Sequence, residues 1–99
     1  IAGPMHHHSK IIPFDNCKVG DVGDVRLLDH YNLDESIREI ETYYHRIKDR
    51  GISPLSAGGD HSITYPILKA LGKDAPLGLL HIDAHCDTMA DFRGSRFQH

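Results

Sequence analysis

Residues 81–88 have the sequence HIDAHCDT and directly follow a short apolar run. Such a run predicts a buried β-strand, in which successive side chains point to opposite faces. His81, Asp83 and His85 would then share one face, and Asp87 keeps the same parity where the chain leaves the strand. Two carboxylates this close repel each other unless a cation or a proton lies between them. We therefore predict that this stretch supplies half of the ligands of a metal site.

A β–α–β unit is predicted around this stretch. Residues 52–57 have the pattern of a short strand, a glycine pair turns the chain, and residues 60–71 carry the apolar stripe of a helix. The second strand covers residues 77–83, and the crossover of such a unit is almost always right-handed. Both strands then end at the same edge of a parallel sheet, where open α/β sheets hold their ligands. This topology would bring His61 to the residues of the second strand.

The remainder of the chain predicts one further helix and one short strand. The helix covers residues 32–50, with Asn32 or Asp34 as its cap and Gly51 after its end. Its apolar face consists of Leu33, Ile37, Ile40, Tyr44 and Ile47. Residues 19–28 predict a short strand bent by glycines, and the first 16 residues predict a loop.

Composition excludes several classes of function. The 99 residues suffice for one small domain, with 39% apolar residues and a formal net charge of −3. That balance excludes a disordered chain and provides no basic surface for nucleic acid. No apolar run approaches the ~20 residues of a membrane helix, and the first residues do not resemble a signal peptide. Two cysteines without a Cys-x-x-Cys motif fit a reducing cytoplasm.

The predicted cluster combines imidazole and carboxylate ligands, which suit Mn, Fe, Zn, Co or Ni. Carboxylates can bridge two ions, so a cluster rich in aspartate suggests two metals ~3.5–4 Å apart that activate a hydroxide. Cys86 has the opposite parity to its neighbours and is left out. His81 lies deeper in the predicted strand, where we expect a core or supporting histidine rather than a ligand. The alternative for the whole cluster is a set of ion pairs without metal.

Three motifs follow one another along the chain: DVGDV at residues 21–25, GGDHS at 58–62 and HIDAHCD at 81–87. Together they resemble the ureohydrolase family, which includes arginase, agmatinase and their relatives, over roughly residues 13–99. The local sequence is more similar to the agmatinase and guanidinobutyrase branch than to true arginases. The resemblance implies an α/β protein with the three-layer αβα arginase/deacetylase-like fold and a parallel sheet, only partly present in this chain.

The resemblance also implies an activity and a set of site residues. Members hydrolyse a guanidinium group to urea and an amine at a centre of two Mn²⁺ ions. His61 and Asp87 would ligate the first ion and His85 the second. Asp83 would bridge both ions. His99 matches a histidine that in agmatinase-like members assists proton transfer and substrate binding.

One family motif has no counterpart in the sequence. A Ser-x-Asp-x-Asp motif completes the metal site in the family, and nothing of that kind follows in these 99 residues. We therefore expect residues 1–99 to be a partial ureohydrolase catalytic domain that lacks the C-terminal metal-binding aspartates, an internal fragment of a longer enzyme. By itself this fragment is expected to bind manganese poorly and to be inactive.

The expected substrate is a small guanidino compound, agmatine, which would yield putrescine and urea. The alternatives are 4-guanidinobutyrate or 3-guanidinopropionate, which carry an anionic rather than a cationic far end. An inactive metal-binding relative is an alternative from another class, but a dead relative would be free to lose the metal ligands that this sequence keeps. On the resemblance alone we expect a homo-oligomer, with no nucleic-acid or membrane partner.

Overall fold

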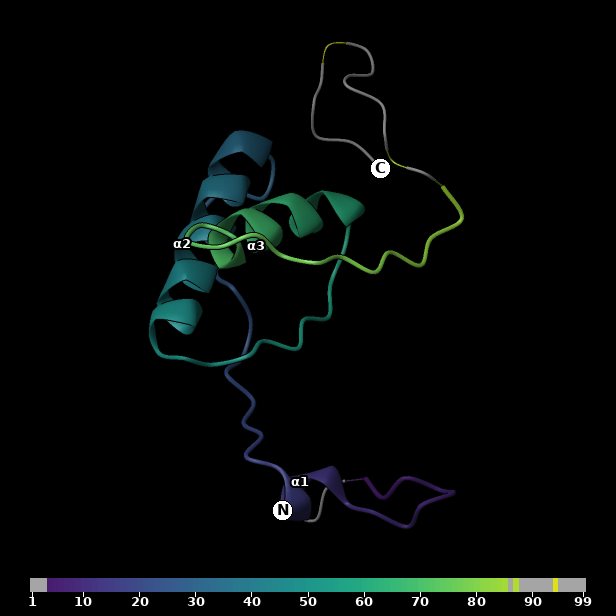
Figure 1. Ribbon diagram of the computed structural model, residues 1–99. Coiled ribbons are helices and arrows are strands. Elements are labelled where there is room, and N and C mark those ends of the chain that lie inside the picture. The colour runs from purple at the N-terminus through teal and green to yellow at the C-terminus, as the bar shows by residue number, and fades with distance from the viewer. Residues whose placement is uncertain (1–3, 86, 88–93, 95–99) are drawn as a thin grey trace.

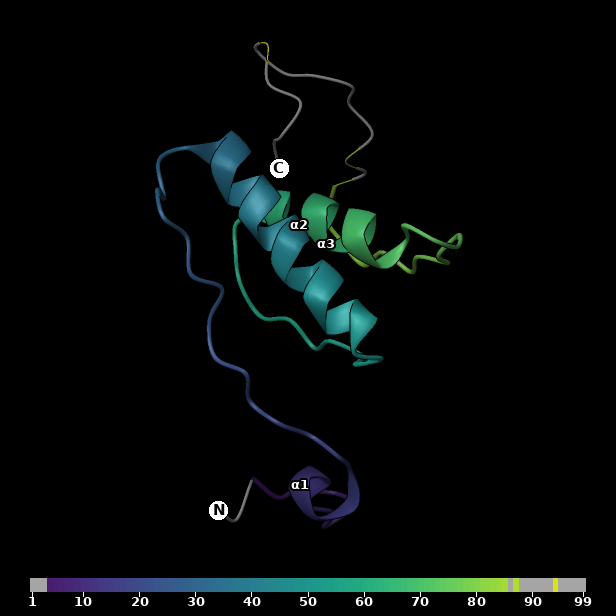
Figure 2. The same ribbon diagram turned by 90° about the vertical axis from the view of Figure 1, so that its left-hand side faces the viewer.

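The computed structural model describes residues 4–85, 87 and 94, and its regular structure is helical (Figure 1). In chain order the elements are α1 (Pro13–Asn16), α2 (Leu33–Asp49), the 3-10 helix η1 (His61–Ile63) and α3 (Thr64–Leu71). Helices α2 and α3 pack against each other, whereas α1 lies away from them at the end of an extended segment (Figures 1 and 2). In this part of the chain, no helix has the length and apolar character that crossing a membrane requires.

Helix α2 confirms the helix predicted over residues 32–50, and both of its ends carry the expected signals. The side-chain oxygen of Asn32 accepts a hydrogen bond from the backbone N–H of Glu35 at 3.2 Å, which satisfies one of the free donors of the first turn. After the last turn, Gly51 has a φ of 67°, a conformation that glycine adopts without steric cost. Its N–H donates to the carbonyl of Lys48 at 2.8 Å and closes the helix.

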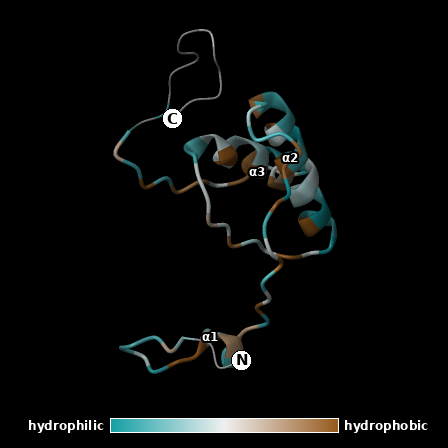
Figure 3. Cartoon of the chain, turned by 180° about the vertical axis from the view of Figure 1, so that it is seen from behind, coloured by the Kyte–Doolittle hydropathy of each residue, from teal (hydrophilic) through white to brown (hydrophobic). Residues whose placement is uncertain are grey.

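The hydrophobic core is the interface between α2 and α3. Ile40 and Tyr44 of α2, each 8% exposed, pack with the fully buried Ala70 of α3. Five partly buried apolar residues surround them: Val25, Leu27, Tyr43, Ile63 and Ile67. Burying a large apolar side chain stabilises a fold by ~1.5–3 kcal/mol, so this interface is the main source of stability in the described chain. Figure 3 shows hydrophobic residues where the two helices meet.

Polar contacts at the rim of this interface fix the helices further. Lys69 Nζ of α3 lies 2.7 Å from Glu41 Oε2 of α2, and the hydrogen bond from Lys69 lowers the pKa of Glu41 despite its partial burial. The Tyr44 hydroxyl and Ser56 Oγ are 2.6 Å apart. That second contact attaches the segment leading into η1 to the side of α2.

The strands predicted over residues 19–28, 52–57 and 77–83 are not formed in the described part of the chain. These segments are extended but lack the hydrogen bonds of a β-ladder. A strand is stabilised by backbone partners on its neighbours and by burial of at least one face. Here Leu55 is 100% and Ile82 90% exposed, so neither condition is met. The predicted parallel sheet is accordingly not seen among these residues.

Candidate metal centre

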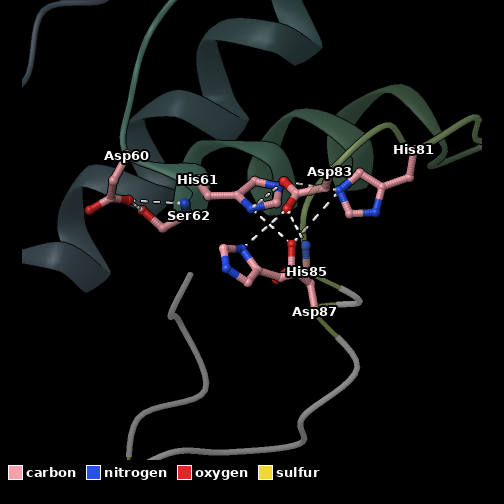
Figure 4. Close-up of polar contacts among 7 residues, drawn as sticks. All are labelled: Asp60, His61, Ser62, His81, Asp83, His85 and Asp87. Atoms are coloured by element: carbon pink, nitrogen blue, oxygen red, sulfur yellow. Dashed lines mark hydrogen bonds and ion pairs between the residues drawn. The ribbon is translucent and has the colours of Figure 1, made fainter.

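His61 is positioned by the beginning of η1. The carboxylate of Asp60, which precedes the helix, accepts a hydrogen bond from the backbone N–H of Ser62 at 2.9 Å and also contacts the Ser62 hydroxyl (Figure 4). The element η1 continues directly into α3, which packs on α2. The GGDHS motif thus ends in a capped helical turn that ties His61 to the hydrophobic core.

The two carboxylates of the candidate site come from the extended segment after α3. Asp83 Oδ1 accepts the backbone N–H of His85 at 2.8 Å, a local turn that the short side chain of aspartate favours. Asp87 has a φ of 48°, in the left-handed region that aspartate tolerates better than most residues. Asp87 Oδ2 lies 2.9 Å from His61 Nδ1, and Asp83 Oδ2 lies 3.7 Å from the same nitrogen (Figure 4).

His81 also belongs to this group of side chains. Its Nε2 atom is 3.6 Å from Asp83 Oδ2 and 3.7 Å from Asp87 Oδ2. Its ring lies 5.5 Å from the ring of His61, measured between centroids. We expected His81 to share a strand face with Asp83 and to act as a supporting residue deeper in that strand, but residues 77–83 form no strand in the described chain. In the structure its imidazole faces both carboxylates directly (Figure 4).

His85 lies at the margin of the group. Its Nδ1 is 3.3 Å from Asp83 Oδ1, and its side chain is 80% exposed. The two oxygens of Asp83 therefore face different imidazoles. Oδ2 faces His61 and His81, whereas Oδ1 faces His85.

The donor atoms of four side chains are close enough to share one cation. One ligand atom from each of His61, His81, Asp83 and Asp87 lies within 4.8 Å of the other three. Two imidazoles and two carboxylates form a donor set that divalent transition metals accept, and the two negative charges balance the charge of such an ion. The residues present therefore fit a divalent metal.

The electrostatics of Asp83 favour its charged form. The hydrogen bond from the backbone N–H of His85 lowers the pKa of Asp83, and the nearby imidazoles of His61, His81 and His85 act in the same direction against partial desolvation. A carboxylate that remains ionised is the form that ligates a metal.

His99 and Cys86 fall outside the described residues. The DVGDV motif at residues 21–25 lies in the extended segment before α2, where Asp21 Oδ1 accepts the N–H of Gly23 at 2.8 Å in a local turn. In the described chain this motif contributes a turn rather than a metal ligand.

The sequence is similar to those of several known enzymes. It is 48% identical over 84 residues to guanidinopropionase of Pseudomonas aeruginosa, a match that covers 85% of this chain and 26% of that protein. It is 50% identical over 88 residues to mitochondrial agmatinase of Gallus gallus, covering 88% of this chain and 26% of that one. Against guanidinobutyrase of P. aeruginosa the identity is 47% over 97 residues, covering 97% and 30%.

The chain thus spans between about a quarter and a third of the length of these relatives. The sequence also matches the Arginase family over residues 2–99, almost its whole length. That match includes both motifs that bring His61 and the two carboxylates together. The chain belongs to the arginase family.

Proposed function

We propose that the natural protein carrying this sequence hydrolyses a guanidino compound to urea and an amine in a manganese-dependent reaction. The observation that carries the proposal is the convergence of His61, Asp83 and Asp87, from two separate motifs, in a chain of the arginase family. The names of its relatives, all guanidino-compound hydrolases, support the same class of reaction.

The residues would divide the work as follows. His61 and Asp87 would hold one Mn²⁺ ion, His85 would hold a second, and Asp83, whose Oδ2 faces His61 and whose Oδ1 faces His85, would serve both. Bound manganese would supply the chemistry of lowering the pKa of a water molecule to near neutrality. His99 binds the substrate and moves a proton, since an imidazole titrates in the neutral range.

Agmatine is the proposed substrate, with putrescine and urea as products. The local sequence of the motifs is similar to the agmatinase and guanidinobutyrase branch, and relatives at 50% and 36% identity carry the name agmatinase. A guanidino acid is the second candidate, because relatives at 48% and 47% identity are named guanidinopropionase and guanidinobutyrase. The two kinds of substrate differ in charge at the end remote from the guanidinium, so one assay separates them.

The test is urea release by the natural protein. Metal is removed with a chelator, Mn²⁺ is restored, and agmatine, 4-guanidinobutyrate, 3-guanidinopropionate and arginine are compared at equal concentration. We expect urea from agmatine only after manganese is restored. Preference for a guanidino acid would replace agmatine with the second candidate, and no urea from any of the four would overturn the proposal.

A variant tests the role of His99 separately. His99→Ala should retain manganese and release urea more slowly, by the ~10²–10⁴-fold typical of a lost acid–base group. Unchanged turnover, or loss of metal together with activity, would contradict this role.

We also propose that residues 52–57 and 77–83 pair as parallel strands of an αβα sheet in the natural protein. The first support is membership of the arginase family. The second is the exposure of Leu55 and Ile82, which helices packed on the sheet would bury. Amide hydrogen exchange tests it: slow exchange across both segments is expected. Exchange as fast as in an unstructured peptide would contradict the pairing.

A further inference from the structure

We propose that Asp60 is a positioning residue for His61, because its side chain fixes the helical turn that holds this imidazole in place to bind the metal. The inference rests on the proposed function only in that both require a divalent cation at His61. It assigns a role to a carboxylate that is adjacent to a metal ligand in the sequence but does not itself bind the metal.

The side chain of Asp60 holds the first turn of η1. Its Oδ1 accepts a hydrogen bond from the backbone N–H of Ser62 at 2.9 Å and also contacts the Ser62 hydroxyl. The first N–H groups of a helix have no partner within the helix, so this bond satisfies a donor that the turn leaves open. The backbone carbonyl of Asp60 also accepts the N–H of Ile63 at 3.3 Å. Asp60 is therefore bonded to the two residues that follow His61.

The same turn is held against the hydrophobic core. Ile63 is one of the partly buried residues that surround the α2–α3 interface. The chain before Asp60 passes close to it, since a Cβ atom on Gly58 would lie 3.2 Å from Ile63 Cδ1. His61 thus lies between two attachments, the cap formed by Asp60 and the packing of Ile63. Loss of the cap would free one side of the turn that carries the imidazole.

The carboxylate of Asp60 is not part of the candidate metal centre. Figure 4 shows it directed toward Ser62, whereas the ring of His61 is directed toward Asp83 and Asp87. Among the described residues, the group of atoms that could share a cation includes His61 and the two aspartates but not Asp60. Asp60 therefore acts on the metal through His61 and not by direct contact.

The position of His61 determines how much affinity this cap contributes. His61 Nδ1 lies 2.9 Å from Asp87 Oδ2, so the ring already faces a second ligand of the same ion. The distances between a metal and its ligands are fixed to within ~0.2 Å. A frayed turn would have to be ordered again before His61 could bind, and the cost of ordering a binding group appears as lost affinity.

The manganese affinity of the natural protein measures this cost. Metal is removed, Mn²⁺ is added back in steps, and the free ion is followed by electron paramagnetic resonance at a temperature where circular dichroism shows every variant to be folded. Asp60→Ala should weaken Mn²⁺ binding by ~10–100-fold, as for other lost contacts behind a metal ligand. Asp60→Asn should bind Mn²⁺ like the wild type, because asparagine caps a helix as well as aspartate does. Unchanged affinity in Asp60→Ala would overturn the proposal.

Asn32→Ala is the matched control. It removes the same kind of cap from α2, the hydrogen bond from the Glu35 N–H at 3.2 Å. This variant should lose stability but keep the manganese affinity of the wild type. An equal loss of affinity in Asn32→Ala and Asp60→Ala would mean that the effect follows general stability, and it would overturn the proposal.

Amide hydrogen exchange in the metal-free protein separates the cap from the charge of Asp60. In Asp60→Ala the amide of Ser62 should exchange faster than in the wild type, while the amides of α2 keep their protection. Loss of manganese affinity without faster exchange at Ser62 would show that Asp60 acts through its charge and not by holding the turn. Loss of affinity in Asp60→Asn with a protected Ser62 amide would lead to the same conclusion, and either result would overturn the proposal.

Failure of this inference is distinguishable from failure of the proposed function, because the metal titration does not depend on turnover. Urea release by the wild type together with unchanged affinity in Asp60→Ala would keep the hydrolase and remove this role of Asp60. Weakened binding in Asp60→Ala, in a protein that releases no urea from any of the four substrates, would keep the role and remove the reaction. No Mn²⁺ binding by the wild type would overturn both.

Discussion

The α2–α3 pair and the segment that carries the aspartates are built in different ways. In the helical pair, side chains of Ile40, Tyr44 and Ala70 are buried against one another, and apolar contact holds the elements together. In the segment after α3, Ile82 is 90% exposed and the ordering contacts are polar, between Asp83, Asp87 and the imidazoles. His61 belongs to both regions, because it begins η1 and faces the carboxylates.

This difference indicates which parts of the molecule depend on which forces. Apolar burial is insensitive to charge, whereas a cluster of carboxylates and imidazoles depends on ionisation and on cations. A substitution in the α2–α3 pair should therefore leave metal binding largely unchanged, and a substitution among the aspartates should leave the helical packing largely unchanged. Effects transmitted through His61 are the exception. The predictions below test this independence, from the largest expected effect to the smallest.

Asp83→Asn should have the largest effect. The change removes a charge that faces three imidazoles, so metal binding and urea release should be lost together, by more than the ~100-fold cost of a supporting contact. Metal content by mass spectrometry and a urea assay measure the two losses. Circular dichroism should remain that of the wild type, because Asp83 lies outside the hydrophobic core between α2 and α3. A variant with full manganese content and full rate would refute the role of Asp83.

Ile40→Ala should have the largest effect on stability. It opens a cavity at the centre of the α2–α3 interface and should lower the free energy of unfolding by ~2–4 kcal/mol, measured in urea. Ile40→Val removes one methylene and should cost only ~0.5–1.5 kcal/mol. Equal effects of the two variants would mean that this position is not packed as described.

Asn32→Ala should have an intermediate effect on the free energy of unfolding. Loss of the hydrogen bond to the Glu35 N–H should lower stability by ~1 kcal/mol, and Asn32→Asp should restore most of it. Thermal melting followed by circular dichroism measures both. Metal affinity should be unchanged, since Asn32 is not among the side chains of the candidate metal centre.

Glu41→Gln should have the smallest effect, with a characteristic pH dependence. Lys69 lowers the folded-state pKa of Glu41, so the pair stabilises the fold above the usual titration range of glutamate. That contribution is lost as the pH falls through the lowered pKa. The variant should melt no more than a few degrees below the wild type at neutral pH, because an ion pair whose Lys69 end remains half exposed to solvent contributes little. The difference should vanish in acid; a difference that is constant with pH would contradict the electrostatic cause.

The sequence predicted the helical region better than the extended one, for a physical reason. A helix carries its hydrogen bonds and its apolar periodicity within one segment, so the prediction over residues 32–50 agrees with α2 at Leu33–Asp49. The strands over residues 52–57 and 77–83 need partners remote in the chain, and their local pattern cannot supply them. In the described residues these segments are extended and exposed instead.

The candidate site was partly predictable in the same sense. The predicted approach of His61 to Asp83 and Asp87 is seen, whereas the strand that was to place His81 on their face is not formed in the described residues. Whether an imidazole ligates a metal or supports a ligand depends on separations of a few tenths of an ångström, which no pattern of residues encodes. The exposure of His85 depends likewise on how the chain turns after Asp83.

The attachment of η1 to the helical pair has a consequence for the order of folding. Each of the helices α2 and α3 forms its hydrogen bonds within one segment, and proteins rich in such local contacts fold in microseconds to milliseconds. The turn at His61 would then be in place before the segment that follows α3 has settled. A divalent cation that binds His61 at this stage would bring Asp83 and Asp87 into place as the last step of folding. The supply of metal would then affect the rate of folding as well as the activity.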